Sequence, residues 1–399
     1  MSEEISDYLK KIIDKIVSEG YFSEIIVFPD LDSIVSASLI IRLASVNGYE
    51  IGVVSSENID EISDRTLSIG FSRARTGIKG YFIGKNRVFS SREDRIILIP
   101  YTHTLTRYLV DVIMRVYSIP RELRSLALAA YLYTISENNM LHNLSDESVR
   151  EATEIFGVDA TRVVIGLKLQ GYYDESYIDK NLLSSIDPYI PSVSGRRDAV
   201  DDIMRKIGSG RGREYIEKVA QEINTRVNMK LLEIGNKPYY EPEYPFTDPY
   251  EAAHCLNIHA NRDLVLTTLY IATGVSGISL LSLKCREEIN RIIYLVDRIL
   301  SKETYEIVVH KINNNRATEI RIDECSREIL YETYLILRDL KIFQEPILFK
   351  CRDRYLYPLR KPIYFSRDVI KSLRGLFIES DDIKKIIEVY RSIEDSYRD

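Results

Sequence analysis

Two aspartates, Asp30 and Asp32, directly follow an apolar run near the N-terminus, within the stretch IIVFPDLDSIVSAS (25–38). Paired carboxylates at the end of a strand can hold Mg²⁺ or Mn²⁺, because these cations prefer hard oxygen ligands. The small residues that follow indicate the start of a helix, whose N-terminus would favour an anion beside the metal. An aspartate just before a helix is also an ordinary N-cap. The local pattern therefore leaves a metal site and a purely structural role open.

The strands expected next to this one, and the helix that follows them, supply few further ligands. The segment GYFIGKN (80–86) contains no carboxylate, RIILIPYTHT (95–104) offers only His103, and LALAAYLYTISENN (126–139) contains no aspartate. Hydrolysis by two metals needs several ligands, so that both ions stay about 3.5–4 Å apart. Two carboxylates without such neighbours would bind a metal weakly and give it no fixed geometry.

The composition is typical of a globular protein with room for two or three domains. The chain has 399 residues, of which 45% are apolar and 29% are charged. No apolar run approaches the roughly 20 residues that span a bilayer, and the acidic N-terminus is not typical of a signal peptide. We therefore expect a cytoplasmic protein with no membrane contact. The net charge of −6 argues against indiscriminate DNA coating but permits a local basic channel.

The cysteines are scattered and form no CxxC pair, and no histidine lies at metal-ligand spacing from them. We therefore expect neither a disulfide framework nor a zinc site. Buried free thiols, which behave as small apolar side chains, are the remaining interpretation. The residues concerned are Cys255, Cys285, Cys325 and Cys351.

Strands and helices are predicted to alternate in the first part of the chain. Apolar residues at helical spacing indicate helices at 1–20, 33–46, 105–116 and 121–135. Short apolar runs indicate strands at 24–28, 52–55, 80–84 and 95–100. Such alternation is typical of an open parallel sheet, in which ligands bind at the carboxyl ends of the strands. Asp30 and Asp32 lie just past such an end.

The rest of the chain has a different pattern. Residues 145–232 are mainly helical in pattern, whereas 236–250 concentrates prolines and aromatic residues, which indicates a domain boundary. Beyond that boundary, helices are predicted at 250–257, 286–300 and 326–340, and strands at 305–310, 319–322 and 346–350. We therefore predict a smaller second α/β domain.

The stretch IIVFPDLDSIVSASLI (25–40) resembles the first motif of the DHH phosphoesterase superfamily, especially the archaeal RecJ-like nucleases. In that family a strand runs into His-x-Asp-x-Asp-Gly, and small residues then open a helix. Asp30 and Asp32 match the two aspartates, but Phe28 replaces the histidine and Ser33 replaces the glycine.

Three later segments resemble the same family, one of which is the apolar helix that ends at Tyr133–Asn138 and corresponds to the family's fourth motif. LLSSIDPYIPSVSGRRDAV (182–200) is similar to the family's Asp-Pro-aromatic segment, and DPYEAAHCLNIHANRD (248–263) is similar to the opening of its second domain, with Asn257 at the family's asparagine. The resemblance covers roughly residues 25 to 280. It implies an α/β protein with a RecJ-like DHH domain built on an open, mostly parallel sheet and a smaller C-terminal DHHA1-like α/β domain. The implied boundaries are 1–180 for the first domain, 181–235 for a helical connector and 236–399 for the second domain.

The departures from the family pattern concern its metal ligands. Where Asp-His-His should follow a strand, the chain has Pro100, Tyr101 and Thr102, and the aspartates expected near Gly84 and Ser136 are missing. The Gly-Gly-Gly-His run of active members is also absent from the last 100 residues. The resemblance thus implies a degenerate phosphoesterase that is not an enzyme, with no catalytic residue, bound metal or cofactor. Its vestigial metal-site positions would be Asp30, Asp32 and His103.

A RecJ-like fold without the metal site characterises the cell division control protein 45 family, which joins the MCM motor and the GINS complex at replication forks. The resemblance implies a non-catalytic subunit of the replicative DNA helicase in the cytoplasm, at the nucleoid. Its partners would be GINS, the MCM helicase and a single DNA strand that it guides.

Three other interpretations stay open from the residues alone. The first is an active Mn- or Mg-dependent 5′ exonuclease of RecJ type that degrades single-stranded DNA. The second is a haloacid-dehalogenase-type phosphatase with Asp30 as nucleophile and Asp32 as acid, although the later acidic pair Asp381–Asp382 follows a helical segment. The third is a scaffold that binds proteins outside replication.

Candidate DNA contacts lie in three basic segments. KCRDRYLYPLRKP (350–362) interleaves cations for phosphates with tyrosines for base stacking, and GRR (195–197) and GSGRGR (208–213) are cationic loops. A solvated strand face and ordinary turns explain the same patterns. His254 and His259 near Asn257 are expected to be hydrogen-bonded structural residues. The candidate DNA-binding residues are Arg196, Arg197, Arg211, Arg213, Asn257, Arg352, Arg354, Tyr355, Arg360 and Lys361.

Overall fold

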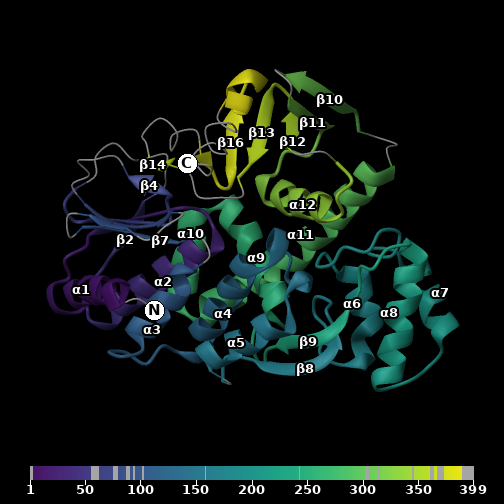
Figure 1. The fold of residues 1–399 in the computed structure, drawn as a ribbon, viewed down its shortest axis with the longest axis horizontal. Coiled ribbons are helices and arrows are strands. Elements are labelled where there is room, and N and C mark those ends of the chain that lie inside the picture. The colour runs from purple at the N-terminus through teal and green to yellow at the C-terminus, as the bar shows by residue number, and fades with distance from the viewer. Residues whose placement is uncertain are drawn as a thin grey trace.

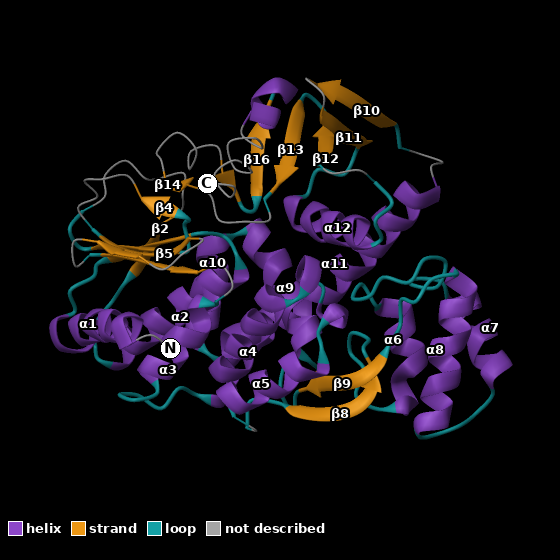
Figure 2. Ribbon diagram, viewed as in Figure 1, coloured by secondary structure: helices purple, strands orange, loops and turns teal. Residues whose placement is uncertain are grey.

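The computed structural model contains an N-terminal sheet, a central group of helices and a C-terminal sheet (Figure 1). The helices α7 (Arg197–Ile207) and α8 (Arg213–Val227) lie at the opposite end from the first sheet, and the two-stranded ribbon of β8 (Arg162–Leu167) and β9 (Ile234–Tyr239) lies between α8 and the central helices (Figure 2). The structure describes residues 3–54, 63–74, 80–86, 90–92, 95–100, 103–157, 159–241, 243–301, 305–312, 315–343, 346–359, 364–365 and 373–388.

The described elements follow the alternation expected from the sequence in the first part of the chain. The helices are α1 (Glu3–Glu19), α2 (Leu31–Val46), α3 (Leu105–Ile113), α4 (Arg121–Ile135), α5 (Asp146–Phe156), α6 (Ile178–Ser184), α7 (Arg197–Ile207), α8 (Arg213–Val227), α9 (Pro249–Arg262), α10 (Leu264–Thr273), α11 (Val275–Ser301) and α12 (Arg327–Asp339). Short 3₁₀ turns are η2 (Glu137–Asn139), η3 (Leu141–Asn143) and η4 (Glu175–Tyr177). The strands are β1 (Glu24–Val27), β2 (Gly52–Val54), β3 (Thr66–Ile69), β4 (Arg73–Ala74), β5 (Tyr81–Asn86), β6 (Ser90–Arg92), β7 (Ile96–Pro100), β8 (Arg162–Leu167), β9 (Ile234–Tyr239), β10 (Ile307–Ile312), β11 (Asn315–Ile322), β12 (Ile347–Cys351), β13 (Arg354–Pro358), β14 (Tyr364–Phe365), β15 (Leu373–Arg374) and β16 (Phe377–Ser380).

The N-terminal sheet has the strand order β2-β1-β3-β5-β7-β6. Neighbours from β2 to β7 are parallel, and only the edge strand β6 is antiparallel to its neighbour. The prediction of an open, mostly parallel sheet is therefore confirmed. The chain first places β2 on one side of β1 and then β3 on the other, so β1 and β3 form a topological switch point, where ligands commonly bind in open α/β sheets.

The C-terminal sheet has the order β10-β11-β12-β13-β16-β15 and is mixed, since only the β11–β12 pair is parallel. The helix α12 packs between this sheet and the helices α9 and α11 (Figure 1). The expected second α/β unit is therefore present. The sequence did not predict β13, β15 or β16, because their apolar residues occur in runs too short to show a clear period.

Two hydrophobic clusters organise the packing. The larger one extends from α1 through α2, α4 and α9 to α12 and the C-terminal sheet, and the smaller one gathers apolar side chains between Leu167 and Leu232. The helices α10 and α2 pack directly together, and the Ser38 hydroxyl donates a hydrogen bond of 2.9 Å to the Thr268 carbonyl. The boundaries at 180/181 and 235/236 stay a prediction.

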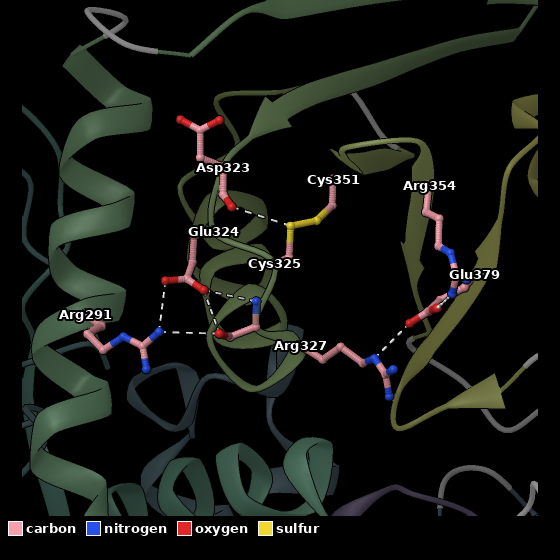
Figure 3. The surroundings of a disulfide bond; sticks show 9 residues. Arg291, Asp323, Glu324, Cys325, Arg327, Cys351, Arg354 and Glu379 are labelled. Atoms are coloured by element: carbon pink, nitrogen blue, oxygen red, sulfur yellow. Dashed lines mark hydrogen bonds and ion pairs between the residues drawn. A yellow bond between two sulfur atoms is a disulfide. The ribbon is translucent and has the colours of Figure 1, made fainter.

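The expectation of free cysteines is wrong. A disulfide joins Cys255 on α9 to Cys285 on α11, and another joins Cys325, just before α12, to Cys351 at the end of β12 (Figure 3). The Cα–Cα distances of 5.4 and 5.7 Å lie in the range that disulfides require. Partners 30 and 26 residues apart meet only because the helices and strands that carry them pack together, which spacing in the sequence does not show.

None of the helices in the described ranges combines the length and the apolarity needed to cross a membrane.

Candidate functional site

The two aspartates lie just past the end of β1, at the switch point of the N-terminal sheet. Asp30 is the N-cap of α2, because its Oδ1 accepts a hydrogen bond of 2.7 Å from the Ser33 amide. This contact satisfies one of the free amides of the first helical turn. The capping role that the sequence left open is therefore present, and it occupies one oxygen of Asp30.

Asp32 is buried and binds the start of a second helix. Its Oδ2 accepts a hydrogen bond of 2.8 Å from the Leu105 amide, and its Oδ1 accepts one of 2.9 Å from the Thr106 amide. Both amides belong to the first turn of α3, where the helix dipole favours a negative charge. Asp32 thus fixes α3 against the start of α2 with both of its oxygens.

Lys85, at the end of β5, places its ammonium group between the two aspartates. Its Nζ lies 2.7 Å from Asp32 Oδ2 and 3.7 Å from Asp30 Oδ2, and the residue is only 3% exposed. Burial alone would lower the pKa of Lys85, but attraction to Asp30 and Asp32 outweighs it and raises the pKa. Lys85 therefore carries a fixed positive charge where a cation between these carboxylates would lie.

The same arrangement shapes the protonation of Asp30. Burial raises the pKa of Asp30, and Asp32 raises it further, while Lys85 and the Ser33 hydrogen bond lower it. Without the ammonium group, two carboxylates this close would disfavour each other's ionised form. Lys85 is therefore the counter-ion that opposes the effect of burial on Asp30, whose pKa still lies above its usual value.

Near the end of β1, apolar side chains and a glycine occupy positions from which other residues could have supplied metal ligands. Phe28, which stands at the histidine position of the motif that the sequence resembles, is 1% exposed and packs edge-to-face on Phe71, with ring centroids 5.5 Å apart. Gly70, just past β3, has φ +93°, and a Cβ at this position would lie 1.8 Å from the Ser33 hydroxyl. The end of β3 therefore approaches α2 closely and leaves no side chain to bind a metal.

His103 lies past the end of β7, in an exposed position. Its Nδ1 is 3.0 Å from the Tyr108 hydroxyl on α3, and the two rings pack edge-to-face at 5.6 Å. Partial burial and the neighbouring Arg107 lower the pKa of His103. No described contact joins His103 to Asp30 or Asp32. The preceding residues 101–102, where the family signature would end, lie outside the described residues.

The donor set at this strand end does not fit a divalent metal. Both oxygens of Asp32 and one oxygen of Asp30 already accept hydrogen bonds, and the ammonium group of Lys85 would repel a cation. Within the described ranges, no group of three or more His, Cys, Asp or Glu side chains could hold a metal ion. The geometry supports a structural ion cluster rather than a reaction centre.

A second polar cluster, the buried histidine network, lies where α9 meets η3 and the segment before α7. Asp187 accepts a hydrogen bond from His142 Nδ1 at 2.7 Å and one from His254 Nε2 at 2.9 Å. The Leu141 amide also donates to Asp187 at 2.6 Å. The carboxylate is 0% exposed, so every one of these contacts is shielded from water.

The network continues into α12 at both of its ends. Glu332 lies 2.6 Å from His254 Nδ1 and accepts a second bond of 2.6 Å from the Asn257 amide group, while Asp339 lies 3.3 Å from His142 Nε2. The expectation that His254 is a hydrogen-bonded structural residue agrees with this geometry. Asn257 is 0% exposed, so its candidate role in DNA contact is corrected: no part of it reaches the surface.

Both histidines of the network are held in the charged form. Burial alone would lower their pKa values, but the neighbouring carboxylates raise the pKa of His142 to about 9 and that of His254 to about 10. Hydrogen bonds from both histidines outweigh burial and hold the pKa of Asp187 well below its usual range. Three carboxylates thus surround two imidazolium groups in the interior.

The candidate DNA contacts around α7 and α8 are exposed cations, most of which have acidic partners. Arg211 is exposed in the loop before α8. Three other arginines form ion pairs with carboxylates. The guanidinium–carboxylate distances are 2.8 Å for Arg196 and Asp297, 3.4 Å for Arg197 and Asp179, and 2.8 Å for Arg213 and Glu217. The pairs leave little uncompensated charge in the loops that the sequence proposed as cationic.

Three further candidate contacts, Arg352, Arg354 and Tyr355, belong to the β12–β13 hairpin, in a different part of the molecule from α7 and α8 (Figure 1). Arg352 is exposed in the turn, with φ 54°. Arg354 lies 3.2 Å from Glu379 on β16 (Figure 3), and the Lys350 ammonium lies 5.2 Å from the centroid of the Tyr355 ring. The last two candidates, outside the described residues, are Arg360 and Lys361.

No protein-family model matches the sequence, and no curated protein matches it. Among solved structures, the chain is similar to CDC45 from Entamoeba histolytica, with a TM-score of 0.57, 9% identity and coverage of 99% of each chain. It also matches manganese-bound RecJ from Thermus thermophilus, with a TM-score of 0.43 and 10% identity over 90% of this chain and 48% of that chain. At 9% identity the likeness to the CDC45 structure concerns the fold, and the fold is the one that the resemblance in the sequence predicted.

Proposed function

We propose that the protein is a non-catalytic subunit of the replicative DNA helicase, which binds the GINS complex and the MCM motor at the replication fork. The observation that carries the proposal is the ion cluster of Asp30, Asp32 and Lys85. A lysine that neutralises two aspartates at the strand end keeps the fold intact and removes the site where a nuclease would bind its metals. A fold retained without its reaction centre suits a protein that works by docking.

The likeness to a CDC45 structure over the full chain supports the proposal at the level of the fold. The partners come from the family that the sequence resembles, and the guiding of a single DNA strand belongs to the same proposal. DNA contact would then depend on exposed cations such as Arg352, since most arginines around α7 and α8 are paired with carboxylates.

Reconstitution with GINS and MCM from the source organism tests the proposal. We expect the chain to elute with GINS, and with GINS and MCM together, in size-exclusion chromatography, and to raise the helicase activity of the mixture. Lys85→Met is the comparison variant in the same chromatography. Partners that dock away from the ion cluster should still bind this variant under conditions in which it is folded. Absence of any complex with either partner at micromolar concentrations would contradict the proposal.

The competing activity, a Mn- or Mg-dependent 5′ exonuclease, has a separate test. A 5′-labelled single-stranded oligonucleotide is incubated with the chain and either cation, and an Asp30→Ala, Asp32→Ala double variant is purified in the same way. We expect no degradation by either protein. Degradation by the wild type alone would show that the ion cluster rearranges to admit metal.

A further inference from the structure

The strands β8 and β9 form a two-stranded antiparallel ribbon at the periphery of the molecule (Figure 2). In its register, Val163 lies opposite Pro238 and Ile165 lies opposite Asn236. The helix α8 packs against the ribbon, and Val164 and Ile234 contact the same hydrophobic cluster as this helix. No described strand pairs with the outer edge of β8.

The backbone groups of Val163 and Ile165 point to that outer edge. The Lys168 amide donates a hydrogen bond of 2.8 Å to the Glu233 carbonyl, one pair beyond Leu167 and Ile234 in the register. Opposed residues in an antiparallel ladder alternate between bonded and non-bonded pairs, so the even-numbered residues of β8 bond to β9 and the odd-numbered ones face away. Pro238, which has no amide proton, stands opposite Val163, as this phase requires.

The two edges of the ribbon differ in their protection. On β9, the outward amide of Asn236 donates a bond of 2.9 Å to Asp146 Oδ1, and Pro238 has no amide to offer. On β8, outside the ladder itself, no hydrogen bond links the outward groups of Val163 or Ile165 to any residue that the structure describes. Proteins usually protect such edges with proline, charge or a covering element, because unpaired strand edges recruit other strands.

The side chains on this edge are apolar and exposed. Val163 is 38% exposed and Ile165 is 68% exposed, although both are β-branched residues that favour packed sheets. An open edge and an apolar side-chain row therefore coincide on the same residues. Together they match what an extended chain recognises when it adds to a sheet, namely backbone bonds for affinity and alternate side chains for specificity.

We propose that the outer edge of β8 is a docking site for an extended segment of a partner protein, which adds to the ribbon as a third strand. The segment would bond to the amides and carbonyls of Val163 and Ile165 and would place apolar side chains, two residues apart, over theirs. This inference depends only on the strand edge and is independent of the proposed role at the replication fork.

A second copy of this chain does not suit the edge as an occupant. Stable dimers bury about 1,200–2,000 Å² of total surface. Two outward backbone residues and two exposed aliphatic side chains supply far less than that area. A short peptide segment needs no such area, because its affinity comes from the backbone bonds of a few residues.

A displayed library of random peptides, selected on the full chain, tests the proposal. We expect the enriched peptides to carry apolar residues at alternate positions and to lose affinity about tenfold or more for Ile165→Pro, which removes one outward amide. Ile165→Thr keeps the amide and the β-branched shape, so its loss should be smaller. The matched control is Leu283→Thr on α11, where the leucine is 75% exposed, and this change should leave binding intact.

Amide hydrogen exchange provides the second measurement and does not depend on the variants. The amides of Val163 and Ile165 should exchange rapidly in the free chain, unlike those of Val164 and Gly166, and should become protected when a selected peptide is added. Protection of Val163 and Ile165 in the free chain would overturn the proposal. So would a selection without enrichment, or peptides whose affinity Ile165→Pro leaves unchanged while circular dichroism shows the variant folded.

Discussion

Lys85 determines what the carboxylates of Asp30 and Asp32 can bind. A carboxylate pair at a strand end attracts cations, and in this chain the cation is a covalently attached ammonium group 2.7 Å from Asp32. The Lys85 side chain is covalently attached to β5, so its contact with the aspartates costs no translational entropy. Unlike a bound metal ion, it does not dissociate when the protein is diluted. The charge that a metal would supply is thereby built into the fold.

Removal of the ammonium group should destabilise the protein strongly. We expect Lys85→Met to lower the free energy of unfolding by about 3–5 kcal/mol, because it leaves the buried carboxylate of Asp32 without its counter-ion. Urea unfolding at pH 7 measures the change. The control is Lys11→Met on the exposed face of α1, which should change stability by less than about 0.5 kcal/mol. Equal effects of the two substitutions would show that the ion cluster contributes nothing specific.

Reversal of the charge should create a weak metal site. In Lys85→Asp a third carboxylate joins Asp30 and Asp32, and hard oxygen ligands of this number can hold Mn²⁺. The variant should be less stable than the wild type without divalent ions, and Mn²⁺ should raise its melting temperature, since a ligand that binds only the folded state stabilises it. The wild type should not respond to Mn²⁺. A wild-type melting temperature that rises with Mn²⁺ would contradict the cluster as described.

The role of Lys85 could not be predicted from local pattern. The sequence analysis correctly placed Asp30 and Asp32 just past a strand. For the end of β5 it noted only that the segment contains no carboxylate, and it gave Lys85 no role. Whether a lysine there turns inward depends on the strand order, because β3 lies between β1 and β5 and is followed by Gly70, which has no side chain. The two aspartates could be recognised as a sequence motif, whereas their partner Lys85 could be identified only from the strand order of the folded sheet.

At the scale of elements, long and strongly periodic segments were predicted well. The helices α1 and α4 agree with the expected ranges to within about two residues, because their apolar residues recur at helical spacing over many turns. The strands β3 and β8 were missed. Thr66–Ile69 is too short to show a period, and Arg162–Leu167 lies between helices in a segment that looked mainly helical.

One disulfide ties α9 to α11, and the other, which Figure 3 shows, ties the start of α12 to β12. In the chain-entropy model, loops of this length stabilise a protein by about 3.5 kcal/mol per bridge. We expect Cys325→Ser with Cys351→Ser to lose an amount of this order in urea unfolding. Thiol titration of the denatured, unreduced wild type should detect no free thiol, whereas titration after reduction should detect all four cysteines. Four free thiols before reduction would contradict both bridges.

At the scale of the whole molecule, the buried histidine network joins segments that are far apart in the chain. His142 follows α4, Asp187 precedes α7, and Glu332 lies on α12 against the C-terminal sheet, so their contacts form only when all three regions are packed. The sequence offered these residues singly, among segments 45 or more positions apart, and gave no sign that they meet. Burial makes the network costly unless every charge in it is matched.

The network should make stability depend on pH above neutrality. His142 and His254 have folded pKa values of about 9 and about 10, above the value of 6.5 for an unperturbed histidine. The folded state therefore binds more protons than the unfolded state between these limits, so its stability is fully present below pH 6.5 and falls as the pH rises toward 10. For His142 alone the shift corresponds to a loss on the order of 3 kcal/mol.

Urea unfolding at a series of pH values from 6 to 10 tests this dependence. The wild type should lose stability steadily as the pH rises, and His142→Asn should be less stable at pH 6 but show a flatter profile. His103→Asn is the control, because the pKa of His103 is lowered and its imidazole is already neutral above pH 7 in both states. A wild-type profile as flat as that of His142→Asn would mean that the network holds neutral imidazoles. In that case ion pairs between charged histidines and carboxylates would not be what holds the three regions together.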